Sequence, residues 1–227
     1  MSKPVLAVEG LSKGFTSGEQ RVAVLSDLSL SVGPGESLAV IGRSGSGKST
    51  LLNLLCGLEI PDEGTITVAG ESFDGAGSSD ADARWAELRR RSIGVVFQDA
   101  NLMPALSLLE NVRLRGHLAG QAVGGERGWL ERLGVGAEVD RYPDKVSGGQ
   151  AQRAALAMVF AMTPALILAD EPTGSLDRHT ADDVADCLFD MQRTTGCALV
   201  LATHDRELAA RCDHLLDLSA LDPMGRE

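Results

Sequence analysis

A glycine-rich loop between an apolar run and a helical pattern constrains the fold of this chain more than any other stretch. The loop reads GRSGSGKST from Gly42 to Thr50; residues 37–41 before it are mostly apolar, and residues 51–55 after it are leucine-rich. A strand, Gly-x-x-x-x-Gly-Lys-[Ser/Thr] and a helix in this order are typical of a phosphate-binding loop. We therefore expect an α/β fold that binds an anion where one buried strand ends.

Each residue type in the loop has a chemical reason for its position. Glycines can adopt positive φ, so backbone N–H groups can close around phosphate oxygens. Lys48 supplies a positive charge for the β- and γ-phosphates, and Ser49 offers a hydroxyl to Mg²⁺. A glycine-rich turn that binds nothing is the alternative, which the flanking strand and helix patterns disfavour. The predicted nucleotide contacts are Gly42, Arg43, Ser44, Gly45, Ser46, Gly47, Lys48, Ser49 and Thr50.

Composition limits the class of protein. The chain has 227 residues, of which 44% are hydrophobic, enough for one α/β domain or for a core with a smaller subdomain. The formal net charge of -11 argues against a nucleic-acid partner, because neutralising phosphates needs a basic surface. The most basic stretch, residues 84–91, has Glu87 inside it and Asp80 and Asp82 before it, so a solvated helix face is the better interpretation.

The cysteines and the apolar runs indicate the compartment. Cys56, Cys187, Cys197 and Cys212 form no CxxC pair and have no histidine at metal-ligand spacing, so we expect reduced, mostly buried thiols. No apolar run reaches the length that spans a membrane, and the first residues do not read as a signal peptide. Any action at a membrane would therefore need a partner or a surface contact.

Polar residues follow two apolar strands in the second half of the chain. Asp170 and Glu171 end the run from Leu166 to Ala169, and His204 follows the run from Ala198 to Ala202. Ligands bind at the carboxyl ends of strands in open α/β sheets. Asp170 is expected to hold Mg²⁺ together with Ser49, and Glu171 to orient or deprotonate a water. A neutral His204 could bind a γ-phosphate; a surface turn and a structural histidine are the alternatives.

Two further positions stay open on residue patterns alone. Gln98 ends the apolar strand from Ile93 to Phe97, where it either faces a crevice or merely caps the strand. Phe15 is flanked by glycine and polar residues, which predicts a loop between an edge strand, Val5 to Glu9, and a second strand, Val22 to Val32. In such a loop Phe15 is either a local plug, the simpler interpretation, or a platform on which a base stacks.

The middle of the chain predicts helices. Helical segments are expected near residues 109–119 and 128–133, and a third from Ala151 to Met162. Ser147 could be the N-cap of the third helix, although two glycines after it allow a second anion-binding helix end. We interpret residues of about 98–164 as a helical unit inserted into an α/β core of about 1–97 and 165–220, with a tail at 221–227.

The ordered set of motifs resembles the nucleotide-binding subunits of ATP-binding cassette (ABC) transporters, over essentially the whole chain. The matching motifs are Walker A at Gly42–Thr50, the Q-loop at Gln98, the signature at Val146–Gln150, Walker B ending at Asp170, the catalytic glutamate at Glu171, the D-loop at Ser175–Asp177 and the switch histidine at His204. Phe15 falls where this family places an aromatic residue that stacks on adenine. The resemblance therefore favours the stacking interpretation of Phe15 over the plug.

The resemblance implies a single ABC ATPase domain, residues 1–227: a RecA-like P-loop core with an antiparallel β subdomain and an inserted helical subdomain. It implies that two copies bind head to tail, with ATP between Walker A of one and the signature of the other. The signature contacts would be Ser147, Gly148, Gly149 and Gln150, and Asp177 would complete the nucleotide contacts. The implied catalytic residues are Glu171, His204, Lys48 and Gln98, and the implied Mg²⁺ ligands are Ser49, Gln98 and Asp170.

Longer matches resemble the bacterial group that includes lipoprotein-releasing and macrolide-exporter ATPases. They are ADEPTGSLD at Ala169–Asp177 and FQDANLMPALSLLENV at Phe97–Val112. The implied partner is an integral membrane permease with a large extracytoplasmic domain that moves lipid-like cargo, which places the chain at the cytoplasmic face of the inner membrane. A permease helix would lie near residues 102–109. The runner-up function is a mechanotransmission ATPase of the cell-division type.

Two departures from the family pattern concern packing. Val146 replaces the usual leucine at the start of the signature, and Met158 stands in the following helix where many relatives have arginine. We expect a modest packing change at Val146 and the loss of one polar contact at Met158. Neither affects the predicted hydrolytic residues.

Overall fold

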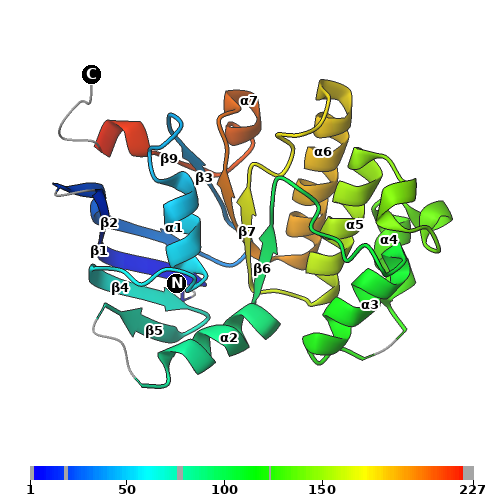
Figure 1. The fold of residues 1–227 in the computed structure, drawn as a ribbon, viewed down its shortest axis with the longest axis horizontal. Coiled ribbons are helices and arrows are strands. Elements are labelled where there is room, and N and C mark those ends of the chain that lie inside the picture. Colours follow the sequence, from blue (N-terminus) through cyan, green and yellow to red (C-terminus); the bar gives the residue numbers. More distant parts are fainter. Residues whose placement is uncertain (1–2, 18–19, 76–78, 123, 222–227) are drawn as a thin grey trace.

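Two β-sheets form the framework of the molecule. In a computed structural model, which describes residues 3–17, 20–75, 79–122 and 124–221, helix α1 (Lys48–Leu55) lies between the two sheets (Figure 1). The antiparallel sheet has the spatial order β2 (Gln20–Val32), β1 (Leu6–Ser17), β4 (Glu63–Val68) and β5 (Glu71–Asp74). The parallel sheet has the order β6 (Ile93–Val96), β7 (Leu166–Asp170), β8 (Ala198–Ala202), β3 (Ser37–Ile41) and β9 (His214–Asp217).

The parallel sheet separates two hydrophobic cores. Successive side chains of a strand point to opposite faces, so Leu166 and Leu168 of β7 enter the first core while Ile167 and Ala169 enter the second. The first core also contains α1 and residues of the antiparallel sheet. Because both faces are covered, β7 and β8 are nearly continuous apolar runs, as expected for parallel strands.

The helices cover the sheet on both sides. Helices α3, α4 and α5 pack against one another, and α5 also packs against α6 and β6, on the side of the parallel sheet away from the antiparallel strands (Figure 1). After α1, the helices are α2 (Ala81–Arg91), α3 (Leu108–Leu118), α4 (Glu126–Arg132), α5 (Gly148–Ala161), α6 (Arg178–Thr195) and α7 (Arg206–Ala209). Short 3₁₀ turns occupy Gly136–Glu138, Pro143–Lys145 and Leu218–Leu221.

Most of the expected elements are confirmed within a residue or two. The strand over residues 198–202 and the helices near 109–119 and 128–133 lie where the pattern predicts them. Helix α5 begins at Gly148 instead of Ala151, because Ser147 and Gln150 form a capping box that carries the two glycines into the first turn. Ser147 is therefore the N-cap of α5, the simpler of the two interpretations, and anion binding at this helix end stays a prediction.

Two expectations about the N-terminal strands are wrong. β1 is not an edge strand, because it pairs with both β2 and β4. Phe15 does not lie in a loop, because β1 continues through it and pairs it with Val22. The strand persists past Gly14 because the Gly14 N–H donates to Asp62 Oδ2 at 2.7 Å, which anchors the far end of the hairpin to the turn before β4.

The expected division of the chain at residues 98 and 164 stays a prediction. Of the predicted tail, Leu221 ends a 3₁₀ turn, and residues 222–227 lie outside the described residues.

Candidate functional site

The carboxyl ends of four neighbouring parallel strands carry the predicted site residues. β6 pairs with β7, β7 with β8 and β8 with β3, all in parallel. The residues that follow these strands therefore meet along one edge of the sheet. In spatial order they are Gln98 after β6, Asp170 and Glu171 at the end of β7, His204 after β8, and the loop that begins at Gly42 after β3.

The phosphate loop has the backbone that its glycines predict. Gly42, Gly45 and Gly47 have φ values of 158°, 80° and 96°. A Cβ atom at Gly47 would lie 2.7 Å from Val24 Cγ1, so a side chain cannot be accommodated there unless the Val24 side chain moves. The loop is closed by a hydrogen bond of 3.1 Å from the Ser46 N–H to the Arg43 carbonyl. The result is a tight turn, and α1 begins directly after it.

Three features of the loop suit an anion. Lys48 Nζ stays within the loop, donating to the Gly42 carbonyl at 2.9 Å and the Arg43 carbonyl at 3.4 Å. Among the described residues, no side chain caps the N-terminus of α1, and its first turn has no acidic residue. Ser46 Oγ is buried and has no hydrogen-bond partner in the described part of the chain. Positive charge and unpaired polar groups therefore converge where a phosphate would bind.

The remaining loop residues are accessible from solvent. Arg43, Ser44, Gly45 and Ser49 are exposed, and Thr50 is half-buried. Ser49 lies in the first turn of α1, which packs against β7 and β8, and β7 ends at the half-buried Asp170. The hydroxyl and the carboxylate predicted to share a metal ion are therefore placed at the same edge of the sheet.

Glu171 and His204 contact each other directly. The distance from His204 Nδ1 to Glu171 Oε2 is 2.9 Å. Glu171 has a φ of 46°, a left-handed conformation that is uncommon for residues other than glycine. Its N–H donates to the Ala202 carbonyl at 2.9 Å, which fixes the turn at the end of β7 against β8. The strained backbone thus holds the carboxylate in front of the histidine.

Thr203 is a site residue that the sequence reasoning missed. Its side chain is 1% exposed, and its hydroxyl donates to Glu171 Oε2 at 3.3 Å while accepting from the Asp205 N–H at 3.0 Å. A threonine between an apolar strand and a histidine was the available signal. Its contacts to Glu171 cross 32 positions of sequence, so the pattern alone could not show them.

Gln98 joins the turn that follows Glu171. The Ser175 hydroxyl donates to the Gln98 carbonyl at 3.1 Å, and a Cβ at Gly174 would lie 3.5 Å from the Gln98 side-chain amide. The residue therefore lies beside the turn that follows β7, and its exposure to a ligand stays a prediction.

The signature residues form a second cluster with the D-loop. In the capping box, Gln150 N–H donates to Ser147 Oγ at 3.2 Å and Ser147 N–H donates to Gln150 Oε1 at 2.9 Å. Gly149 lies against α6, because a Cβ there would be 2.2 Å from Thr180 Cγ2. Gly148 lies against the D-loop, with its ideal Cβ position 3.4 Å from Leu176 Cδ2.

The D-loop carboxylate belongs to the same cluster. Asp177 is the N-cap of α6, and hydrogen bonds from the Thr180 hydroxyl and N–H lower the pKa of its carboxyl. Within the described ranges, no hydrogen bond joins residues 147–150 to the phosphate loop. The structure therefore brings the predicted site residues together as two separate groups.

A pocket opens beside the phosphate loop. It has a volume of about 380 Å³ and is lined by Ile41, Gly42, Arg43, His204, Arg206, Asp217 and Ser219. This volume lies within the roughly 300–1,000 Å³ typical of small-ligand sites.

Phe15, on β1, is 40% exposed, and Lys13 Nζ lies 5.2 Å from the centre of its ring.

Among the described residues, no three His, Cys, Asp or Glu side chains are close enough together to hold a metal ion. A divalent ion at Asp170 would therefore need other oxygen ligands, such as a serine hydroxyl and phosphates. That donor set is the usual one for Mg²⁺ at nucleotides.

A family model described as "ABC transporter" matches residues 25–174, which spans the phosphate loop, Gln98, the signature residues 147–150 and the turn after Glu171. The chain belongs to the ABC transporter family. This ABC chain is 43% identical over 218 residues to the ABC transporter ATP-binding protein YbbA of Escherichia coli K12, covering 94% of each chain. It is 45% identical over 219 residues to the lipoprotein-releasing system ATP-binding protein LolD of Bordetella pertussis, covering 95% of this chain and 93% of the relative.

Solved structures agree with the ABC assignment. A dimeric structure of MJ0796, a bacterial ABC transporter cassette, matches with a TM-score of 0.81 and 32% identity, covering 93% of each chain. A second structure of the same cassette, a post-hydrolysis state bound to ADP and Pi, matches with a TM-score of 0.80. The expected fold class, an ABC ATPase fold, is confirmed. None of the helices in the described part of this ABC chain has the length and apolarity needed to cross a bilayer.

Proposed function

We propose that this chain is the ATP-hydrolysing subunit of a bacterial ABC transporter that works on lipid-like or lipoprotein cargo. The observation that supports it best is the edge of the parallel sheet, where the phosphate loop, Asp170, Glu171 and His204 lie at the ends of neighbouring strands. Phosphoryl transfer needs charge neutralisation on the γ-phosphate and a positioned water. This edge offers residues for both.

The phosphate loop would bind the nucleotide. Its N–H groups and Lys48 Nζ would exchange the internal carbonyl contacts of the loop for phosphate oxygens, and the buried Ser46 hydroxyl would gain a partner. Ser49, Asp170 and Gln98 would hold Mg²⁺, which neutralises charge on the β- and γ-phosphates when bound. The exposed Phe15 ring would stack on the base.

Glu171 would polarise the attacking water. Its carboxylate is held by the Thr203 hydroxyl and by His204, so its orientation is set before substrate arrives. His204 is 72% exposed at its side chain, compared with 20% for Glu171, and is therefore free to meet a γ-phosphate.

A second copy of the chain would complete the site. The signature group, Ser147 to Gln150, makes no hydrogen bond to the phosphate loop of its own chain within the described residues. A head-to-tail pair would bring it to the nucleotide on the partner's phosphate loop, and the MJ0796 cassette is described as dimeric. Asp177, packed beside the signature on α6, would enter the same interface.

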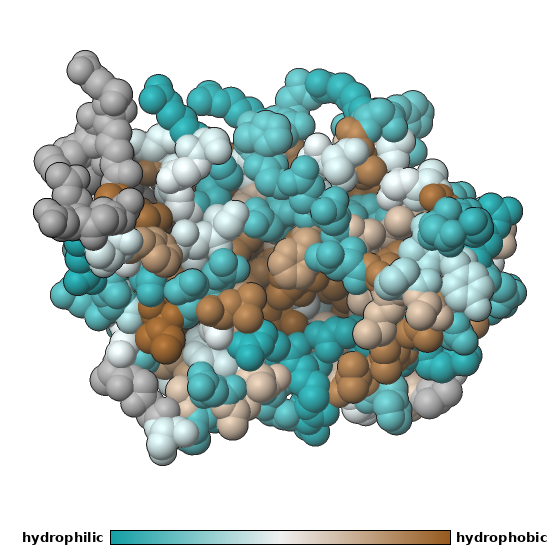
Figure 2. Space-filling view, in the orientation of Figure 1, coloured by the Kyte–Doolittle hydropathy of each residue, from teal (hydrophilic) through white to brown (hydrophobic). Residues whose placement is uncertain are grey.

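A membrane permease would be the further partner, held at the cytoplasmic face of the inner membrane. The relative LolD is named for lipoprotein release, which supports lipid-like cargo. The permease would carry a large extracytoplasmic domain, as the resemblance to the lipoprotein-releasing group implies. The segment expected to meet the permease, residues 102–109, contains Met103, whose side chain is 53% exposed, and Phe97 just before this segment is 41% exposed. Figure 2 shows apolar residues gathered in a hollow in the middle of the face that includes β6 and α3.

The Glu171→Gln variant tests this proposal. Because the carboxylate acts mainly in the transition state, we expect turnover of ATP to fall by about 10²- to 10⁴-fold while the affinity for ATP changes by less than about threefold. Steady-state phosphate release and equilibrium binding of a fluorescent ATP analogue measure the two quantities.

The matched control is Glu131→Gln, which removes one carboxylate from an exposed ion pair with Arg127 on α4, away from the site. It should hydrolyse ATP at the wild-type rate. Normal turnover in Glu171→Gln, or a loss of ATP affinity without a loss of turnover, would contradict the role proposed for Glu171.

A further inference from the structure

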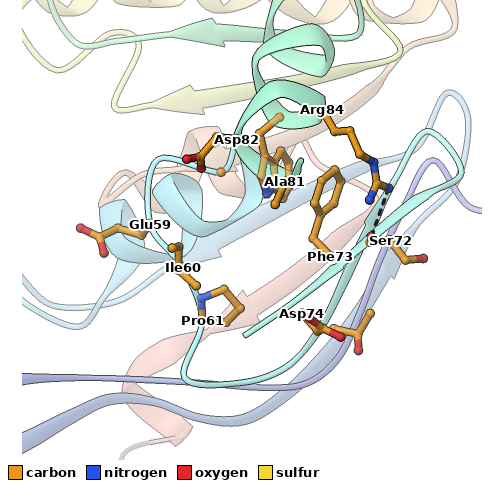
Figure 3. A pocket seen from close by; sticks show the side chains of 12 residues that line it. Glu59, Ile60, Pro61, Ser72, Phe73, Asp74, Ala81, Asp82 and Arg84 are labelled. Atoms are coloured by element: carbon orange, nitrogen blue, oxygen red, sulfur yellow. Dashed lines mark hydrogen bonds between the residues drawn. The ribbon is translucent and has the colours of Figure 1, made fainter. Parts of the chain in front are cut away.

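A second pocket lies at the opposite end of α1 from the phosphate loop. Its volume is about 200 Å³, and its walls come from the turn after α1, from β4 and β5, and from the start of α2. Figure 3 shows Ile60 and Pro61 of the turn on one side, Phe73 of β5 across from them and Ala81 of α2 above. None of the predicted site residues lines this pocket.

The aromatic wall of the pocket is held rigidly. The rings of Phe73 and Trp85 stack with centres 3.9 Å apart and an interplanar angle of 22°. Gly57 makes this possible, because a Cβ there would lie 2.1 Å from Trp85 Cδ2. Arg84 lies over the outer face of Phe73, 4.6 Å from the ring centre, and donates to Glu71 at 3.0 Å. The wall is therefore built before any ligand arrives.

Carboxylates surround the mouth of the pocket. Asp74 of β5 and Asp82 of α2 are exposed, and neither has a hydrogen-bond or ion-pair partner for its side chain among the described residues. Glu59 adds a third carboxylate, which lies 3.3 Å from Lys13 Nζ. The positive group nearest the wall, Arg84, is already paired with Glu71. The pocket therefore combines an aromatic wall with unneutralised negative charge at its mouth.

The size and the charge of the pocket select one kind of ligand. A volume of about 200 Å³ is below the roughly 300–1,000 Å³ of typical cofactor sites, so the pocket suits a single side chain better than a nucleotide. An apolar stem with a cationic head would pack on Ile60, Pro61 and Phe73 while its charge meets Asp74 and Asp82. Lysine and arginine side chains have this shape.

We propose that this pocket receives a lysine or arginine side chain from a cytoplasmic segment of the membrane permease. The inference rests on the proposed function, which supplies a permease as partner. Cytoplasmic loops of membrane proteins carry an excess of lysine and arginine, so such a partner has the required chemistry. The net charge of -11 on this chain attracts the same loops.

The position of the pocket links it to the nucleotide. Helix α1 has eight residues and is therefore about 12 Å long, with the phosphate loop at its start and Gly57 of the pocket just past its end. Arg89 of α2 donates to the Cys56 and Gly57 carbonyls at 2.9 and 3.0 Å, which fixes the pocket wall to the end of α1. A side chain anchored there contacts the same rigid helix that holds the phosphates.

The first experiment tests the chemistry of the pocket. The chain has two tryptophans, so Trp129→Phe leaves Trp85 as the sole indole reporter. This variant is titrated with hexylguanidinium, hexanoate and hexanol, which share an apolar stem and differ in charge. We expect saturable changes in Trp85 fluorescence with hexylguanidinium at an affinity at least about tenfold above that of hexanoate. Adding Asp74→Asn and Asp82→Asn should reduce this preference at least about fivefold. Equal binding of the cation and the anion, or no response to either, would overturn the proposal.

The second experiment tests the partner. Affinity-tagged Glu171→Gln protein with ATP is used to recover integral membrane proteins from detergent-solubilised membranes of the source organism. The same recovery is repeated with Asp74→Asn/Asp82→Asn added, and with Asp186→Asn/Asp190→Asn on α6 as a control of equal charge change. We expect the first pair to reduce recovery of the permease at least about fivefold and the control pair to leave it unchanged.

The outcomes separate the two proposals. If a permease is recovered equally well with the Asp74 and Asp82 variants, the pocket inference is wrong and the proposed function stands. If no integral membrane protein is recovered by any form, the permease partner fails, and the inference fails with it. All variants in the pocket should keep wild-type ATP hydrolysis when tested without the Glu171 substitution, because the pocket contains none of the predicted site residues.

Discussion

The carboxylate of Glu171 is held by two neighbours that both come from the end of β8. Thr203 Oγ1 lies 3.3 Å and His204 Nδ1 lies 2.9 Å from the same oxygen, Oε2. The second oxygen, Oε1, has no protein hydrogen bond among the described residues and is available to a water. In the proposed hydrolysis of ATP, a carboxylate oriented in this way would lose little freedom when the reaction begins.

Thr203→Val should weaken this arrangement without removing the carboxylate. The change deletes the hydrogen bond to the charged Glu171 and also the one from the Asp205 N–H, so we expect turnover of ATP to fall by about 3- to 30-fold at nearly unchanged KM, equivalent to about 0.6 to 2 kcal/mol. Steady-state hydrolysis over a range of ATP concentrations measures both constants.

Thr203→Ser is the matched control, since it keeps the hydroxyl and removes one methyl group. It should retain most of the wild-type turnover. Valine keeps the buried Thr203 methyl and serine keeps the hydroxyl, so a serine variant slower than the valine variant would show that the methyl matters more than the hydrogen bond to Glu171, which would contradict this prediction.

For single residues, the sequence predicts which residues lie at the edge of the sheet better than it predicts which side chains they contact. The phosphate loop, Asp170, Glu171 and His204 were predictable because each follows an apolar run, and parallel strands end at a common edge. Thr203 and the pair between Glu171 and His204 were not, because they depend on the side-by-side placement of β7 and β8 across more than 30 positions of sequence.

Among the elements, α5 and α6 approach more closely than side chains at their contact would allow. The ideal Cβ position at Gly149 lies 2.2 Å from Thr180 Cγ2, well inside the range in which atoms overlap. Gly149 therefore has a packing role in addition to any contact with nucleotide, because it permits the signature helix to rest on the helix that follows the D-loop.

Gly149→Ala should destabilise the fold, because the added methyl group collides with Thr180. We expect a loss of about 1–3 kcal/mol in the free energy of unfolding, as for other overpacked contacts. Urea unfolding followed by circular dichroism measures it.

Thr180→Ser provides the rescue. It removes Cγ2 and keeps the hydroxyl that donates to Asp177 at 2.6 Å. In Gly149→Ala/Thr180→Ser the stability should return to within about 1 kcal/mol of the wild type, since alanine also favours helix over glycine by roughly that amount. A double variant as unstable as Gly149→Ala would place the strain elsewhere than at Thr180.

The strands show where pattern reading succeeds and where it fails. β7 and β8 are buried on both faces, so their apolar runs identify them. β1 and β2 form a long hairpin whose register shifts at three places and whose outer face is polar, so Gly14 and Thr16 look like loop residues. Contacts with residues distant in sequence, such as the hydrogen bond from the Gly14 N–H to Asp62, extend β1 past positions where the local strand propensity is low.

Three arginines join the ends of helices α1, α2 and α3, and the sequence alone does not predict these contacts. Arg89 of α2 donates to the carbonyls after α1, Arg115 of α3 donates to the Arg89 carbonyl at 2.7 Å, and Arg90 donates to the Leu118 carbonyl at 2.8 Å. Cations are favourable at helix C-termini, where carbonyls lack partners. These contacts connect α1, α2 and α3 in series, so the helical part of the chain is attached to the helix that begins at the phosphate loop.

For the molecule as a whole, the four thiols lie in the two hydrophobic cores or pack against them. Burial raises the pKa of Cys56, Cys187, Cys197 and Cys212, in the case of Cys212 from 9.0 to about 11. The expectation of reduced thiols agrees with the absence of any disulfide among the described residues, although only Cys56 and Cys197 are fully buried. Each thiol therefore resists deprotonation while the fold is intact.

Native protein at pH 8.5 should react with iodoacetamide at least about tenfold more slowly at each cysteine than urea-unfolded protein does, because the thiolate is the reacting form. The pKa of Cys212 is about 11 in the folded protein and 9.0 in the unfolded chain. Its contribution to the free energy of unfolding is therefore full below pH 9.0 and is lost as the pH rises toward 11. Mass spectrometry of time-quenched samples measures the rate at each site. A cysteine alkylated as fast in native as in unfolded protein would contradict its burial.

The strand order also determines when the molecule can assemble during synthesis. β3, which carries the phosphate loop, pairs with β8 and β9 within the described residues, and both begin beyond residue 197. In a chain emerging from the ribosome, both edges of β3 therefore stay unpaired until β8 and β9 have been translated. Contacts of such long sequence separation form slowly, and an unpaired strand edge invites aggregation in the meantime. The position of β3 between β8 and β9 makes the strand that carries the phosphate loop dependent on two strands made much later, and on protection from other chains until they are made.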